Sequence, residues 1–87
     1  MDILSILKMD LGISSTALDA YLEKIIEEAK TAISREGITV HDTDEDGMLI
    51  ENYAAFLYRS RRENEQEMPK NLRRMLNNRL FSEKAST

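Results

Sequence analysis

The chain has 87 residues and a formal net charge of −4, which is enough material for one modest hydrophobic core and therefore for one domain. It contains no cysteine and one histidine, which excludes disulfide frameworks and thiolate metal sites and nearly excludes catalytic pairs built on histidine. No apolar run is long enough for a membrane span and no basic signal-peptide region is present, so we expect a soluble intracellular protein without membrane contact.

The charges are unevenly divided along the chain. Residues 1–58 hold four basic and twelve acidic residues, a net charge of −8, whereas residues 59–87 hold eight basic and four acidic residues, a net charge of +4. This polarity suits head-to-tail packing of identical subunits, in which the acidic end of one meets the basic end of the next. Two separately solvated faces would give the same pattern, so charge alone does not decide between these interpretations.

The first half of the chain predicts two helices, over residues 2–11 and 16–36, each followed by a glycine. Asp2 is placed to cap the first helix. Thr16 and Asp19 have the spacing of a capping box at the start of the second. The second helix has the clearer periodicity, with apolar residues recurring on one face: Leu18, Leu22, Ile25, Ile26, Ala29 and Ile33.

Residues 38–40 (ITV) are β-branched and therefore favour an extended backbone. They predict a short strand or an apolar link held against the core. A third helix is predicted to begin near Asp46 and to be the most buried of the set, because its apolar face is wide. That face contains Leu49, Ile50, Tyr53, Ala54, Phe56, Leu57 and Tyr58.

Pro69 suits the first turn of a fourth helix, which continues through Leu72, Met75, Leu76 and Leu80. We therefore predict an all-α fold: a small bundle of about four helices, with a short extended link between the second and third. The single domain is expected to cover residues 1–81, and residues 82–87 are expected to form a frayed tail.

The stretch around the third helix start resembles half of a calcium site. Asp42, Asp44, Asp46 and Gly47 stand at the first, third, fifth and sixth positions of an EF-hand loop. The twelfth position, which requires a bidentate glutamate, is Tyr53. We therefore interpret the acids as the start of a helix, where negative charge is favourable, and keep a calcium-responsive module only as an alternative.

The last third of the chain is rich in arginine, a side chain that binds phosphate and carboxylate equally well. The sequence pI near 5 and the interleaved glutamates argue against a dedicated DNA-binding protein, although a small helical DNA-binding or regulatory protein remains the alternative function. We hypothesise that Arg59, Arg61 and Arg62 contact Glu27 or Glu28 of a neighbouring subunit. A solvated arginine cluster would have the same sequence. The candidate interface residues are Glu27, Glu28, Arg59, Arg61, Arg62, Arg73 and Arg74.

Nothing in the sequence indicates catalysis. There is no glycine-rich phosphate loop and no nucleophile–base pair, and His41 stands alone. Residues 14–16 are hydroxyl-bearing, but they precede a predicted helix, where capping is their ordinary role. We expect a protein that is not an enzyme, with no cofactor and no catalytic, cofactor-binding or metal-ligating residues.

The order of these segments resembles a known family. Residues 53–65 (YAAFLYRSRRENE), an aromatic helix that runs into a charged stretch, and residues 68–81 (MPKNLRRMLNNRLF) carry most of the likeness. They are similar to the head–tail connector family of tailed bacteriophages, also described as adaptor, head-completion or DNA-packaging proteins.

The resemblance implies an α-helical subunit that forms a ring below the portal, extends the DNA channel and offers a platform for stopper or tail-completion proteins. It implies neither enzymatic activity nor a cofactor. The implied partners are further copies of the chain, the portal, the stopper or tail proteins, and DNA that passes without sequence-specific binding. The implied location is the head–tail junction of the virion, with the host cytoplasm during assembly.

Overall fold

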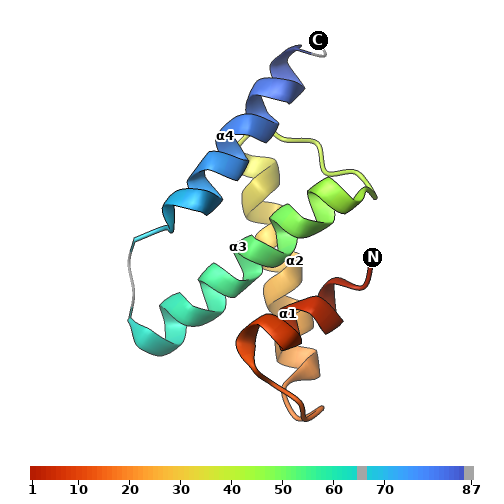
Figure 1. Cartoon of the computed structure of the whole chain (residues 1–87), viewed down its shortest axis with the longest axis vertical. Helices are drawn as coiled ribbons and strands as arrows, with labels where there is room; N and C mark the ends of the chain where they lie inside the picture. Colours follow the sequence, from red (N-terminus) through yellow and green to blue (C-terminus); the bar gives the residue numbers. More distant parts are fainter. Residues whose placement is uncertain (65–66, 86–87) are drawn as a thin grey trace.

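The computed structural model describes residues 1–64 and 67–85, and these residues form four α-helices and no strand (Figure 1). α3 is central: α2 crosses behind it, and α1 and α4 lie on opposite sides of it. The predicted all-α bundle of four helices is confirmed. The helices are α1 (Ile3–Leu11), α2 (Asp19–Arg35), α3 (Asp44–Glu63) and α4 (Lys70–Ala85).

α1 has the ends that its sequence predicts. The Asp2 side chain accepts a hydrogen bond from the Ser5 backbone N–H at 3.3 Å. At the other end, Gly12 has a left-handed φ of 72°. Its N–H donates to the Met9 carbonyl, while the next N–H donates to the Lys8 carbonyl, which is the Schellman arrangement. The chain therefore turns sharply after α1, which allows α2 to pack against it.

The capping box predicted at the start of α2 is wrong. Leu18 occupies the N-cap position without a side-chain hydrogen bond, and the Thr16 carbonyl accepts from the Asp19 N–H in a turn. The Asp19 carboxylate lies 2.7 Å from the Lys8 ammonium of α1, so it does not return to the backbone of Thr16. An ion pair between two helices has replaced a local cap.

A threonine cap is found instead at α3. The Thr43 hydroxyl accepts a hydrogen bond from the Asp46 N–H at 3.2 Å, so α3 begins at Asp44, two residues earlier than predicted. The first turn contains three acidic residues and the last turn contains Arg61 and Arg62, an arrangement that complements the helix dipole at both ends.

The core is shared by all four helices and the link before α3. The buried face of α3 includes Leu49, Ile50, Ala54 and Tyr58 as predicted, but Tyr53, Phe56 and Leu57 are only half-buried. The reason is that α1 and α2 both pack on α3, so the deepest side of the helix is centred on its small residues rather than on its aromatic ones. The fully buried large apolar side chains are Leu7, Leu22, Ile25, Ile33, Leu72 and Leu76.

The link between α2 and α3 has the predicted apolar anchor, since Ile38 is buried in the core. The predicted fraying from Ser82 is wrong for residues 82–85, which continue α4 as far as Ala85. The Glu83 carboxylate accepts from the Thr39 N–H of the link and from Arg79, and these bonds hold the last turn in place. Residues 86–87, the rest of the predicted tail, lie outside the described residues.

Candidate functional site

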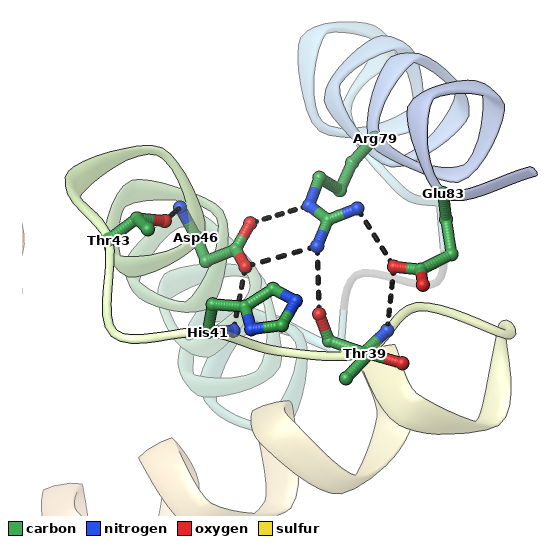
Figure 2. Close-up of polar contacts among 6 residues, drawn as sticks. All are labelled: Thr39, His41, Thr43, Asp46, Arg79 and Glu83. Carbon is green, nitrogen blue, oxygen red and sulfur yellow. Dashed lines mark hydrogen bonds and ion pairs between the residues drawn. The ribbon is translucent and has the colours of Figure 1, made fainter. Parts of the chain in front are cut away.

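The side chain of Arg79 is buried, and it reaches from α4 toward the link and the start of α3 (Figure 2). Its Nε lies 2.7 Å from Asp46 Oδ1 and its Nη2 lies 2.8 Å from the Thr39 carbonyl oxygen. Its Nη1 lies 3.0 Å from Glu83 Oε1. The second Asp46 oxygen accepts from the His41 N–H at 2.8 Å. These five residues form what we term the Arg79 network.

The charges of the Arg79 network are paired within it, which keeps its two carboxylates ionised. Burial alone would raise the pKa of Asp46, but hydrogen bonds from Arg79 and from the His41 N–H outweigh it and hold that pKa below its ordinary value. The hydrogen bond from the Thr39 N–H, aided by Arg79, likewise lowers the pKa of Glu83. The hydrogen-bond donors and acceptors satisfy each other within the network. Its role is therefore structural, because it holds α4 against the link between α2 and α3.

The same network bears on the resemblance to a calcium loop. The Asp46 carboxylate is bound by Arg79 and is 1% exposed, whereas Asp42 and Asp44 are exposed. Across residues 1–64 and 67–85, no three His, Cys, Asp or Glu side chains are grouped so that they could hold a metal ion. The third acid of the apparent calcium loop therefore serves as the partner of an arginine.

Two of the predicted interface residues meet each other within one chain. The Arg61 guanidinium binds Glu28 in a bidentate geometry, with Nη1 to Oε1 at 3.0 Å and Nη2 to Oε2 at 2.9 Å. The hydrogen bond from Arg61 lowers the pKa of Glu28, and the same bond raises the pKa of Arg61. The hypothesis paired these residues across subunits, and the structure instead uses them to join α2 to α3.

Arg59 and Arg73 also have intramolecular partners. Arg59 donates to the Asp10 carbonyl at 3.3 Å and lies 3.7 Å from its carboxylate, which ties α3 to the end of α1. Arg73 lies 3.8 Å from Glu36, at the end of α2. These loose contacts are exposed, so each stabilises the fold only slightly.

The remaining predicted residues face solvent. Arg62 is exposed and lies over the Tyr58 ring at 5.5 Å from its centroid, and Glu27 pairs with Lys30 on its own helix at 3.1 Å. Arg74 is exposed and makes no ion pair with the described residues. The seven predicted residues thus form several separate contacts and exposed positions rather than one site.

One buried acid on α3, Glu51, was not predicted from the sequence. Glu51 is 2% exposed, and burial, together with the influence of the Asp10 carboxyl group, raises the pKa of Glu51 to about 7. A signal was present in the sequence, because Gly47, Glu51 and Ala55 are spaced four residues apart, and small residues on both sides of a position indicate close helix packing.

Comparison with known proteins adds no assignment: no family model, no curated protein and no solved structure matches the chain. Within the part of the chain that the structure describes, no helix combines the length and the apolar character needed to cross a membrane.

Proposed function

We propose that the chain is a head–tail connector subunit of a tailed bacteriophage, with a structural rather than a catalytic role. In this proposal it forms a ring below the portal, extends the DNA channel and binds stopper or tail-completion proteins, first in the host cytoplasm and then in the virion. The sequence resemblance motivates the proposal. The observation that supports it best is the separation of exposed charge along α3.

α3 is about 30 Å long, since its 20 residues each add about 1.5 Å. One end carries exposed acids, and the other end lies on the same side of the molecule as the start of α4, which carries exposed bases (Figure 1). Two unlike patches at opposite ends suit a heterologous contact, which generates a ring when the rotation between subunits closes. The acidic patch is Asp42, Asp44 and Glu45, and the basic patch is Arg62, Lys70 and Arg74.

These patches replace the pairing first predicted from the sequence. Glu28 and Arg61 already satisfy each other within one subunit, whereas none of the six patch residues makes an ion pair with another described residue. The net charge of −4 also suits a channel, because a protein with few phosphate contacts lets DNA move past it.

Reversal of the basic patch tests the ring contact. The double variant Arg62→Glu, Arg74→Glu is expected to weaken self-association roughly tenfold or more at low ionic strength, because attraction between the patches becomes repulsion. Light scattering across a concentration series gives the mass, and electron microscopy of the concentrated protein shows whether the particles are closed rings.

Lys24→Glu is the control, because Lys24 is an exposed cation on α2 that belongs to neither patch. A second variant that also carries Asp42→Lys and Glu45→Lys reverses both patches and is expected to restore assembly. A chain that stays monomeric at millimolar concentration in low salt, or a control that weakens assembly as strongly, would contradict the proposed contact.

The exposed basic patch also favours a second candidate, a small helical protein that binds DNA. Three cations at one end of the molecule would produce salt-dependent, sequence-independent binding. Retardation of duplex DNA by the isolated chain, lost in the Arg62→Glu, Arg74→Glu variant, would support this candidate. Closed rings that do not retard DNA would favour the connector.

A further inference from the structure

The exposed side of α4 carries a large apolar side chain next to a cleft. Phe81 is 77% exposed and lies three residues after Asn78, so the two side chains are neighbours on the helix surface. Asn78 lines a cleft of about 220 Å³ between α4 and the first two turns of α3. A cleft of this size has room for a phenyl ring, since an engineered cavity of roughly 150 Å³ holds benzene.

The lining of this cleft, which we term the α3–α4 cleft, is mainly apolar. Met48 and Leu49 of α3 and Met75 of α4 supply the apolar groups, and Met48 is 39% exposed. Methionine thioethers make favourable contacts with aromatic rings. An exposed apolar side chain that stands alone is ordinary, whereas one that lies beside an apolar groove indicates a contact surface. The polar groups of the lining are Glu45, Asn78 and Arg79.

Phe81 does not fill the cleft of its own chain. Its side chain is not among those that line the cleft, and it remains largely exposed. The ring and the cleft lie on the same surface of the molecule. A second copy turned by a two-fold rotation therefore presents its cleft to the first ring and its ring to the first cleft. One surface thus supplies both halves of a contact.

The charges around the ring and the cleft are complementary. Glu45, which lines the cleft, is exposed and acidic. No acidic side chain is exposed among residues 70–85, since Glu83 is half-buried and bound to Arg79. A partner that fits the cleft must bring an aromatic ring together with positive charge, and α4 of a second copy brings both. The exposed cations of α4 are Lys70, Arg73, Arg74 and Lys84.

We propose that two copies of the chain associate about a two-fold axis, with Phe81 of each copy seated in the α3–α4 cleft of the other. Every contact is then made twice, and the two aromatic rings are the apolar anchors of the interface. The contact does not depend on the connector proposal. Phe81 belongs to neither of the charged patches of that proposal, so it is the residue on which the test depends.

The mass of the full chain in solution tests the contact. In about 1 M salt, where exposed charges are screened beyond about 3 Å, the unaltered chain is expected to form dimers at millimolar concentration. Phe81→Ser is expected to weaken this association roughly tenfold or more, because it removes the anchor. Met9→Ser is the matched control, since Met9 is 80% exposed on α1, and it is expected to dimerise like the unaltered chain. Sedimentation equilibrium measures all three.

The position of the ring is tested by NMR on a mixture of isotope-labelled and unlabelled chains. Filtered nuclear Overhauser spectra record only contacts between different copies. They are expected to connect the Phe81 ring of one copy with the Met48 methyl group of the other. The Phe81→Ser variant is expected to fold normally, because the side chain it alters is exposed, and circular dichroism checks this.

Three results would overturn the two-fold contact: a chain that stays monomeric at millimolar concentration in high salt, equal masses for Phe81→Ser and Met9→Ser, or intermolecular contacts of Phe81 only with residues outside the cleft. Closed rings formed equally well by the unaltered chain and by Phe81→Ser would also overturn it, while leaving the connector proposal intact. Dimers that depend on Phe81 and never form rings would support the two-fold contact and contradict the connector.

Discussion

Replacement of Arg79 by leucine is expected to lower the free energy of unfolding by roughly 3–5 kcal/mol, because it leaves the Asp46 carboxylate buried without its charged partner. The Thr39 carbonyl and the Glu83 carboxylate lose a donor in the same step. A change of this size lowers the melting temperature of a domain of this length by roughly 15 °C or more. Urea denaturation followed by circular dichroism measures it.

Arg74→Leu is the matched control, since Arg74 is an exposed arginine on the same helix. Its effect is expected to stay within about 0.5 kcal/mol. The double variant Arg79→Leu, Asp46→Asn is expected to lose less stability than the sum of the two single variants, because the second change removes the unpaired charge that the first creates. Equal losses for Arg79→Leu and Arg74→Leu would refute the structural role of the network.

Leu22→Ala is expected to lower the free energy of unfolding by roughly 2–5 kcal/mol, because the fully buried leucine leaves a cavity that its neighbours in the core fill only in part. A loss of this size is a large share of the total free energy of unfolding expected for a chain of this length. Thermal and urea denaturation measure the loss. Leu18→Ala, at a half-buried position one turn earlier, is the control and is expected to lose clearly less. Similar losses at both positions would contradict the position of the core.

The helices were predictable because each depends on a local pattern that the structure preserves. Apolar spacing and Gly12 fixed the extent of α1, and Pro69 marked the start of α4. The caps were less predictable, since a threonine followed three residues later by an aspartate precedes two of the predicted helices, at Thr16 and at Thr43. Only Thr43 caps its helix. Asp19 instead forms an ion pair with Lys8 of another helix, and a contact between two helices cannot be predicted from the residues around Thr16.

The candidate site was less predictable, because sequence analysis treats all arginines in the last third of the chain alike. Arg79 faces the link between α2 and α3, whereas Arg74 is exposed. This difference depends on how α4 packs against residues that are far from it in the sequence. The hypothesis placed Arg59, Arg61 and Arg62 against Glu27 or Glu28 of a neighbouring subunit, whereas the structure pairs Arg61 with Glu28 within one chain. Complementary charge does not distinguish a partner in the same chain from one in a neighbour. Glu51 was missed because acids are rarely buried.

The hydrogen bonds to Thr39 also limit how the chain can aggregate. Residues 38–40 are β-branched and lie outside the helices, and an exposed segment with these residue types can pair with another chain as a strand. The Thr39 N–H donates to the Glu83 carboxylate, and the Thr39 carbonyl accepts from Arg79. Both backbone groups that such a strand would use at Thr39 are therefore already hydrogen-bonded. The last turns of α4 thus cover the backbone of Thr39, and release of α4 would expose it to other chains.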